Sequence, residues 1–428
     1  MTQSQNKSPV PAGAPPRVFL LPPPDLPVPA VEGGAVETLI THLIEENERH
    51  GLLRLECASI PHPKARAAAA GWRNTRMHWI APPHAAACRL YGPWRGLMQR
   101  LGRLEHWPQN PWYLAAARRI RAAGPAALVA EGGNLAEPAR ILARTGLGRA
   151  ACFAHLHMQT TPTPFLHKAY GGVLGISGFV LERWQAGGLP CAKHLVYNCV
   201  DLARFCPAPA APGEGRAAVR ASLGFAEKDF VILFCGRICP EKGVHKLLRA
   251  MPLLPESCKL LIVGSPFFAA EDTSPFFERL KSLAAPLTAA GRVRFTGFVQ
   301  NRRLPRYYRA ADAACLPALW DEPAGITAIE AMACGCPVVA TRSGGMSEYL
   351  AGSGAVLLER DELFNDDGRT QPLPGVPPLE GQIAAALAAL AGDPARRAEM
   401  AAAGVRRAQS FGREGYYRQF CRAVGAVQ

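Results

Sequence analysis

Apolar residues along the chain form short continuous runs, separated by longer stretches in which they recur every three or four positions. Arg17–Leu21 is one such run, and others occupy residues 52–59, 126–131 and 151–157. Each has the length of a buried strand. Residues 35–50 instead carry their apolar side chains on one helical face. Strands that alternate with helices of this length indicate a parallel sheet covered on both faces.

A second series of strands and helices follows the Pro- and Ala-rich residues 207–215. Its strands are predicted in apolar runs at residues 229–236, 259–264, 292–299, 313–318, 337–341 and 354–359. Helices are predicted around residues 247–251, 276–287, 304–311 and 326–334, and a helical pattern rich in Ala and Arg runs over 394–427. The chain therefore predicts an α/β fold of two Rossmann-like halves, with a ligand between them at the carboxyl ends of the strands.

The expected domain boundaries follow from these two halves. Residues 1–16 are polar and Pro-rich, which predicts a disordered tail. Residues 17–207 are expected to form the first domain and residues 216–405 the second. Residues 406–428 are expected to form a helix that packs back on the first domain.

Composition narrows the class of protein. Hydrophobic residues make up 49% of the 428 positions and charged residues 19%, which supplies large cores and excludes a wholly disordered chain. We expect neither a membrane span nor a signal peptide, because no apolar run is long enough and the first residues are polar. The 13 cysteines form no Cys-x-x-Cys pair, so we expect free thiols and a cytoplasmic protein.

Positive charge is concentrated in the first half of the chain. Residues 1–210 carry 22 Lys and Arg against 12 Asp and Glu, whereas the remainder carries 26 against 22. Residues 89–121 hold seven arginines and one acid among Trp and Tyr residues. This mixture suits an anionic membrane surface or a phosphorylated saccharide, and it equally fits a solvated face over buried tryptophans. We hypothesise attachment to the inner face of the cytoplasmic membrane.

The strongest local pattern is a pair of glutamates within residues 322–337. Glu330 lies on the predicted helix and Glu322 on the loop before it, so both could line one cleft. Backbone amides at Gly325 and Thr327, where the helix begins, could bind an anion. The same spacing also fits an ordinary amphipathic helix with surface acids.

Two cations flanked by glycines follow the strand predicted at 229–236. Arg237 and Lys242 lie between Gly236 and Gly243, at a strand-to-helix turn. Glycines let the backbone approach closely, and two fixed charges suit the oxygens of a diphosphate. A solvated cationic turn is the alternative interpretation.

Three segments at successive strand ends together carry a family resemblance. GRICPEKG, EPAGITAIEAMACGCPVVAT and SGGMSEYL, which span 236–243, 322–341 and 343–350, resemble the retaining glycosyltransferases of family 4, which have the GT-B fold. The segments YNCVDLARF at 197–205 and ISGFVLERW at 176–184 agree with this. PAVEGGAVETLI, beginning at Pro29, is similar to a loop of a bacterial subgroup that includes spore-coat polysaccharide enzymes and lipopolysaccharide-core N-acetylglucosaminyltransferases.

The resemblance assigns roles to individual residues. It implies that Glu322 contacts the donor sugar during catalysis and that Glu330 binds the donor ribose. It implies that the donor diphosphate is bound by two cations and by backbone groups of both domains: Arg237, Lys242, Gly33, Gly34, Gly325, Ile326 and Thr327.

The family usually places a histidine near the reacting sugar, at the end of a strand of the first domain. His155 and His157 both lie at the end of the strand predicted at 151–157. We favour His157 as the catalytic residue.

The implied function is transfer of a hexose of the GlcNAc or glucose type from a UDP-sugar, with retention of configuration. The implied acceptor is the lipopolysaccharide core, another surface polysaccharide or a lipid-linked saccharide. The sequence has no Asp-x-Asp motif for a divalent metal, so we expect no metal and no cofactor. Fixed cations and the helix start would then stabilise the departing diphosphate.

Two other functions use the same features. A nucleotide-sugar epimerase or a sugar phosphorylase could have this scaffold, although no lysine motif for a pyridoxal cofactor is recognisable. A basic, non-catalytic nucleic-acid-binding protein belongs to a different class. The sequence has no nucleic-acid-binding motif, so no nucleic-acid partner is expected.

Overall fold

The computed structural model describes residues 14–102, 104–184, 189–208, 213–266, 274–365 and 368–427. Nearly all of the tail expected at residues 1–16 lies outside the described residues, as does the middle of the Pro-rich stretch 207–215.

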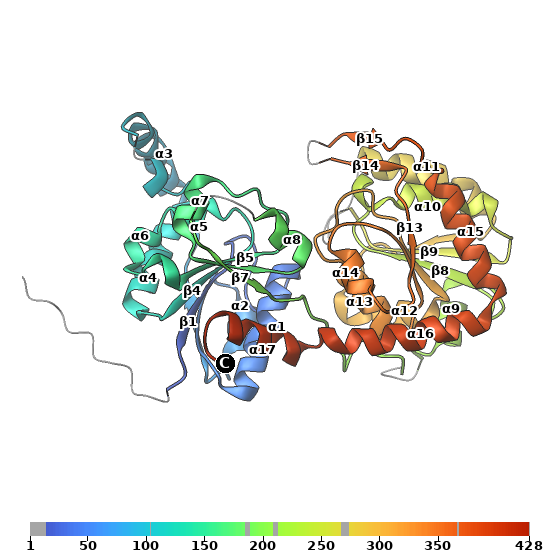
Figure 1. Ribbon diagram of the computed structural model, residues 1–428, viewed down its shortest axis with the longest axis horizontal. Coiled ribbons are helices and arrows are strands. Elements are labelled where there is room, and N and C mark those ends of the chain that lie inside the picture. The colour runs from blue at the N-terminus through green and yellow to red at the C-terminus, as the bar shows by residue number, and fades with distance from the viewer. Residues whose placement is uncertain are drawn as a thin grey trace, which may run out of the picture. The chain divides into compact units, whose positions relative to one another are not determined.

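The chain divides into two compact units, each built around its own parallel sheet (Figure 1). Unit 1 contains the chain up to Gly175, residues 183–196 and the chain from Tyr417 onward, and unit 2 contains the rest. Unit 2 thus includes residues 176–182 and 197–207, which the sequence had placed in the first domain, and residues 406–416, which it had placed in a helix packing on that domain. The backbone amide of Asn198 donates to the Tyr349 hydroxyl at 2.9 Å, a contact that attaches the segment beginning at Tyr197 to unit 2.

The sheet of unit 1 has the strand order β3-β2-β1-β4-β5-β6-β7 and is parallel throughout. Its strands are β1 Arg17–Leu21, β2 Arg54–Ser59, β3 Thr75–Trp79, β4 Ala127–Glu131, β5 Cys152–Leu156, β6 Gly172–Gly175 and β7 Ala192–Leu195. The strands predicted from apolar runs are confirmed as β1, β2, β4 and β5. The other three escaped prediction because β3 and β7 are polar edge strands and β6, with the sequence GVLG, has only two apolar side chains between glycines.

Seven helices lie wholly within unit 1. They are α1 Ala35–His50, α2 Pro63–Ala69, α3 Ala85–Arg100, α4 Trp112–Ala123, α5 Ala136–Ala139, α6 Leu142–Thr145 and α7 Pro164–Ala169. Helix α8, Gly178–Arg183, lies where the chain crosses between units, and α17, Arg413–Ala423, ends in unit 1. The hydroxyl of Tyr417 in α17 donates to Asn47 Oδ1 of α1 at 2.7 Å, in a buried contact.

The sheet of unit 2 has the order β10-β9-β8-β11-β12-β13 and is also parallel. The six runs predicted from the sequence form it: β8 Phe230–Cys235, β9 Cys258–Val263, β10 Val293–Phe295, β11 Ala313–Leu316, β12 Val338–Thr341 and β13 Val356–Leu358. A small antiparallel pair, β14 Glu362–Phe364 and β15 Thr370–Pro372, was not predicted. All six residues of β8 are buried, which makes this strand the centre of the core of unit 2.

The helices of unit 2 are α9 Arg216–Leu223, α10 Val244–Ala250, α11 Pro275–Ala289, α12 Pro305–Ala310, α13 Ile326–Ala333, α14 Met346–Leu350, α15 Leu379–Gly392 and α16 Pro394–Ala408. The helical pattern over 394–427 is broken in the structure, since α16 ends before Gln409 and α17 begins at Arg413. Gly412 has extended backbone angles there and pairs with Val200.

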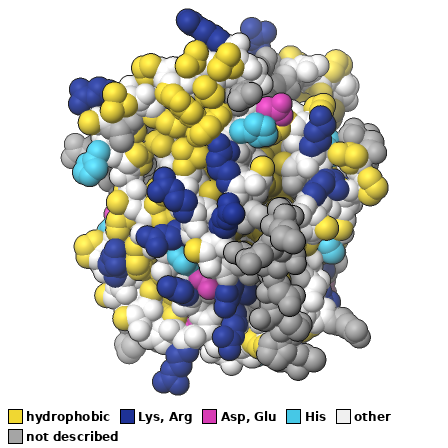
Figure 2. Space-filling view, turned by 90° about the vertical axis from the view of Figure 1, so that its left-hand side faces the viewer, with side chains coloured by type: hydrophobic (Ala, Val, Ile, Leu, Met, Phe, Trp, Pro, Cys, Tyr) yellow, Lys and Arg dark blue, Asp and Glu magenta, His cyan; other side chains and the backbone are white. Residues whose placement is uncertain are grey.

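Helix α3 stands away from the sheet of unit 1 (Figure 1) and exposes apolar side chains. Leu90 and Leu97 of α3 and Leu101, its C-cap, are 78%, 50% and 57% exposed. Their spacing of seven and eleven positions puts them on one helical face. Figure 2 shows hydrophobic side chains gathered near the top of one face of the molecule, on which Lys and Arg far outnumber Asp and Glu. By contrast, Trp112 and Tyr113 are buried core residues, so the aromatic residues of 89–121 do not all belong to one surface.

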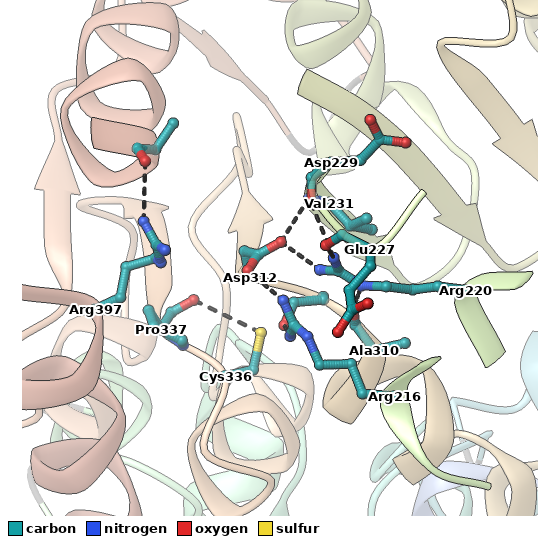
Figure 3. A network of polar contacts seen from close by, with 12 residues as sticks. Arg216, Arg220, Glu227, Asp229, Val231, Ala310, Asp312, Cys336, Pro337 and Arg397 are labelled. Atoms are coloured by element: carbon teal, nitrogen blue, oxygen red, sulfur yellow. Dashed lines mark hydrogen bonds and ion pairs between the residues drawn. The ribbon is translucent and has the colours of Figure 1, made fainter. Parts of the chain in front are cut away.

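Asp312, directly before β11, is held by two arginines of α9 (Figure 3). Its carboxylate accepts hydrogen bonds from Arg216, from Arg220 and, at 2.7 Å, from the amide of Val231 in β8. The buried Arg220 guanidinium also donates, at 2.8 to 2.9 Å, to the carbonyls of Ala310, Glu227 and Asp229. The charges of the buried Arg220 and of Asp312 are therefore paired, and these contacts attach α9 to β8 and to the start of β11.

Asp312→Asn should destabilise unit 2. The substitution leaves the Arg220 guanidinium, with 1% of its side chain exposed, without its counter-charge. Removing one partner of a buried pair costs about 3–5 kcal/mol, so we expect the free energy of unfolding in urea to fall by about 3 kcal/mol or more.

The matched control is Glu359→Gln. Glu359 pairs with Arg342 at 2.9 Å, but both side chains are more than half exposed, so the expected loss is below about 1 kcal/mol. Equal losses for the two variants would show that Asp312 is not a structural anchor.

Candidate active site

In unit 2 the residues of interest follow β8, β11 and β12. These strands are neighbours in a parallel sheet, so their carboxyl ends lie along one edge. Arg237 and Lys242 follow β8, the segment containing Glu322 follows β11, and Ser343 follows β12. The sheet topology therefore gathers the predicted motifs at one edge.

The turn after β8 is built on glycine. Gly243 has a φ of 69°, and a Cβ there would lie 1.9 Å from the carbonyl oxygen of Pro317, beyond β11. Only glycine allows this close approach. It fixes Lys242, the preceding residue, against the segment that follows β11. Arg237 remains half exposed, 3.5 Å from Glu241 Oε1.

Lys242 and Glu322 form an ion pair. Lys242 Nζ lies 2.5 Å from Glu322 Oε2, and the indole N–H of Trp320 donates to the same oxygen at 3.0 Å. The lysine ammonium also lies 5.3 Å from the centre of the Trp320 ring, within the range of a cation–π contact. Lys242 and Glu322, which come from two separate sequence motifs, are thus in direct contact. Trp320 was missed, because nothing in the sequence distinguishes it from a core tryptophan.

The segment around Glu322 is held by the loop after β12. The amide of Glu322 donates to Ser343 Oγ at 3.0 Å, and its carbonyl accepts from the amide of Gly345 at 2.8 Å. A Cβ on Gly344 would lie 2.5 Å from the Glu322 carbonyl oxygen. Gly344 and Gly345 therefore allow the two loops to pack closely, and this packing fixes the position of Glu322.

Helix α13 begins beside this segment. Its N-cap, Gly325, has a φ of 94°, and a Cβ there would lie 2.9 Å from Met346 Cγ. The amides of Ile326 and Thr327 belong to the first turn, where a helix leaves its N–H groups without intrahelical partners. They could bind an anion, as the sequence suggests.

Glu330 is buried inside the same helix. The Tyr308 hydroxyl donates to Glu330 Oε2 at 2.8 Å, and the Asn301 amide donates to Oε1 at 3.1 Å. Burial raises the pKa of Glu330 to about 7, although both hydrogen bonds lower it. The interpretation of Glu330 as a surface acid is therefore wrong. Tyr308 and Asn301 were not predicted, since both lie far from Glu330 in sequence.

In unit 1 the candidate residues follow β1, β4 and β5, which are adjacent strands. Gly33 and Gly34, with φ of 97° and 93°, immediately precede α1. His157 lies just beyond β5, and its Nε2 is 3.1 Å from Glu131 Oε2 at the end of β4. Among the described residues, Glu131, His155 and His157 are the one group whose side chains could together bind a metal ion.

Comparison with known proteins agrees with this architecture. Residues 215–359 match the family model for glycosyl transferases group 1. The D-inositol 3-phosphate glycosyltransferase of Salinispora arenicola is 36% identical over 177 residues, which are 40% of this chain and 38% of that protein. The chain therefore spans well under half the length of this relative.

A longer match is to the GDP-mannose-dependent alpha-(1-6)-phosphatidylinositol monomannoside mannosyltransferase of Mycobacterium tuberculosis. It is 30% identical over 292 residues, which are 66% of this chain and 69% of that protein. Among solved structures, Anabaena Alr3699/HepE in complex with UDP and glucose has a TM-score of 0.70 at 17% identity, and the match covers 96% of this chain and 100% of that one.

The two parallel sheets and these structural neighbours define the GT-B fold, which confirms the fold expected from the sequence. The chain belongs to the group 1 glycosyl transferases, the family 4 glycosyltransferases that its strand-end motifs resemble.

Glu330→Gln should change how stability depends on pH. The native pKa of Glu330 is raised from 4.5 to about 7, so the native state holds this proton more tightly than the unfolded chain does. The wild type therefore loses stability as the pH rises from about 4.5 to about 7, and a glutamine does not. Between about pH 5 and about pH 8, urea denaturation should show the variant gaining about 2 kcal/mol relative to the wild type.

The control for this measurement is Glu278→Gln, at a side chain that is 54% exposed. Its stability should follow the wild-type pH profile. If the profile of Glu330→Gln did the same, Glu330 would not have a raised pKa in the folded protein.

Proposed function

We propose that this protein transfers a hexose from a nucleotide sugar to a saccharide or lipid-linked acceptor, with retention of configuration and without a metal ion. The observation that carries the proposal is the Lys242–Glu322 pair, fixed at the strand ends where the family motifs meet. Retention is an inference from the family. It is testable by the anomeric configuration of the product.

Departure of the nucleoside diphosphate is the step that these charges favour. As the bond between the sugar and the phosphate breaks, negative charge grows on the diphosphate. Arg237 and Lys242 would receive this charge, together with the amides of Ile326 and Thr327. Both cations already have carboxylate neighbours, which keep them in place before the donor binds.

Glu322 would change partners when the donor arrives. In the structure Glu322 accepts hydrogen bonds from Lys242 and Trp320. A diphosphate that draws the ammonium toward its own oxygens frees the carboxylate to accept hydroxyl groups of the donor sugar. The ion pair thus joins the two residues that the proposal uses in catalysis.

Glu330 would bind the ribose of the donor. Tyr308 and Asn301 hold its two oxygens, and each oxygen keeps further capacity to accept a hydroxyl group. Gly33 and Gly34 are assigned to the diphosphate and His157 to the reacting sugar, as the family resemblance implies.

Metal independence rests on the sequence, which lacks the Asp-x-Asp motif, and on cations that are part of the chain. The donor base is proposed as uridine, the choice of the bacterial subgroup whose loop Pro29–Ile40 resembles. Support comes from the structural neighbour, which binds UDP and glucose. The Mycobacterium tuberculosis relative is named for GDP-mannose, so a donor screen should include UDP-GlcNAc, UDP-glucose and GDP-mannose.

The acceptor is proposed to be presented at an anionic membrane surface, as a lipopolysaccharide core or a similar lipid-linked saccharide. Support comes from α3, where Arg89 and Arg100 flank the exposed leucine face. Leucines inserted among lipid head groups, with arginines beside them, are typical of helices that lie on membranes. No helix within the described ranges has both the length and the apolar character to cross a bilayer.

A nucleotide-sugar epimerase on the same scaffold makes a different prediction. It would convert the donor to an isomeric sugar nucleotide without any acceptor, whereas a transferase releases the nucleoside diphosphate when the acceptor is supplied. Analysis of the donor after incubation alone distinguishes the two enzymes.

Lys242→Ala and Glu322→Ala should each reduce sugar transfer by about 100-fold or more, because each removes a charge placed against the reacting diphosphate or sugar. Lys281→Ala is the control, since this lysine lies on α11 and is 46% exposed. Thermal unfolding should be nearly unchanged in all three variants. Full activity in Lys242→Ala or Glu322→Ala would refute the residue roles proposed here.

The membrane proposal is tested on the leucine face of α3. Replacing Leu90 and Leu97 together by serine should reduce co-sedimentation with phosphatidylglycerol vesicles by about 10-fold, because two side chains lose their apolar burial. Leu253→Ser, at a leucine of unit 2 that is 63% exposed, should bind like the wild type. Wild-type binding that does not differ between anionic and neutral vesicles would reject the proposal.

A further inference from the structure

Three titratable side chains meet where β4 and β5 end in unit 1. Glu131 closes β4 and pairs in register with His155 of β5, and His157 follows two residues later. The side chains of Glu131 and His155 are fully buried, and that of His157 is 7% exposed. The proposed function uses only His157, so the other two polar side chains in this dry environment need an explanation.

One carboxylate oxygen holds both rings. Glu131 Oε2 lies 2.8 Å from His155 Nδ1 and 3.1 Å from His157 Nε2. The two imidazole rings lie 4.1 Å apart between centres, tilted by 42°. The carboxylate therefore fixes the orientation of both rings at the strand ends.

The charge states determine where the protons lie. Burial raises the pKa of Glu131, but His155 and His157 outweigh burial and lower this pKa to about 2. Burial, and then the neighbouring His155, lower the pKa of His157 to about 4. At neutral pH, Glu131 is ionised and His157 is a neutral imidazole with a single N–H. Since a carboxylate can only accept hydrogen bonds, the N–H of His157 must lie on Nε2.

We propose that Glu131 is a positioning residue that holds His157 in its Nε2–H tautomer, so that Nδ1 accepts a hydrogen bond from a sugar hydroxyl at the reacting centre. This inference rests on the proposed function for the catalytic role of His157. It adds which ring nitrogen accepts the hydrogen bond and which residue selects the tautomer. Within the part of the chain that the structure describes, Nδ1 of His157 has no hydrogen-bond partner. His155 Nδ1 lies 2.8 Å from the same oxygen.

Backbone geometry reserves space for the His157 ring. Gly132, the residue after Glu131, has a φ of 65°, and a Cβ there would lie 3.0 Å from Cδ2 of His157. Glu131 and Gly132 are thus consecutive residues beside the same imidazole. The carboxylate hydrogen-bonds to the ring, and the glycine leaves room for it because it has no side chain.

A divalent metal ion is the competing occupant of this cluster. Both nitrogens lie at N–H···O distances from a single oxygen, 2.8 and 3.1 Å. A tetrahedral zinc with bonds of about 2.0–2.1 Å would hold its ligand atoms about 3.3 Å apart. The spacing therefore favours hydrogen bonds, and the test below includes zinc.

The test measures the tautomer of His157 directly. Long-range proton–nitrogen spectra of protein labelled with ¹⁵N-histidine, with the His157 signal assigned by its loss in His157→Asn, should show an Nε2–H ring in the wild type. Glu131→Gln should populate the other tautomer, because an amide can donate as well as accept. Glu131→Asp should restore the Nε2–H form, since it keeps an oxygen that only accepts.

Glu56→Gln is the matched control. Glu56 in β2 lies 2.5 Å from Nε2 of His78 in β3, and both side chains are about one-tenth exposed. This variant should leave the His157 signal unchanged. Glu131→Gln should lower kcat by about 10- to 100-fold with little change in the KM of the donor, because in the other tautomer Nδ1 carries the proton and cannot accept the hydrogen bond of the sugar hydroxyl.

Three results would overturn the inference: an Nδ1–H ring in the wild type, an unchanged tautomer in Glu131→Gln, or stoichiometric binding of added Zn²⁺ with loss of the Nε2–H signal. Full activity of His157→Ala is a separate outcome. It would refute the catalytic role given to His157 in the proposed function, while the tautomer measurement would still stand.

Discussion

The Lys242–Glu322 ion pair is the interaction on which the proposed chemistry depends. Its two side chains are 22% and 13% exposed, against 1% and 10% for the Arg220–Asp312 pair, so it is the less buried of the two pairs and we expect it to contribute less to stability. Its role is to hold a cation and a carboxylate together at a strand end. A ligand with negative charge at one end and hydroxyl groups at the other can separate such a pair. Its negative charge then binds the cation, and its hydroxyl groups donate to the carboxylate.

That pair is placed by the backbone rather than by its own attraction. Gly243 brings the lysine turn against the segment after β11, and Ser343 and Gly345 hold the backbone of Glu322 through both its amide and its carbonyl. Because the two side chains need not move far, a bound donor would meet charges that are already oriented. Electrostatic preorganisation of this kind is usually the largest contribution to catalysis of a charge-separating step.

Much of unit 2 could be predicted from the sequence, since buried parallel strands appear as continuous apolar runs. β8, β11 and β12 were found in this way, and the motifs at their ends followed from the family resemblance. The edge strands β3 and β7 could not be found, because they are polar and are defined only by pairing with β2 and β6. Trp320, Tyr308 and Glu131 were missed for a related reason: their importance lies in contacts with residues that are distant in sequence or carry no local pattern.

The central claim is that charges belonging to the chain, not a bound metal ion, receive the departing diphosphate. The most direct test is the turnover number of purified protein with its best sugar nucleotide and acceptor, after dialysis against EDTA and again with added Mg²⁺ or Mn²⁺. The account predicts the same turnover in all three conditions. Turnover that disappears with EDTA and returns with the metal ion would contradict it.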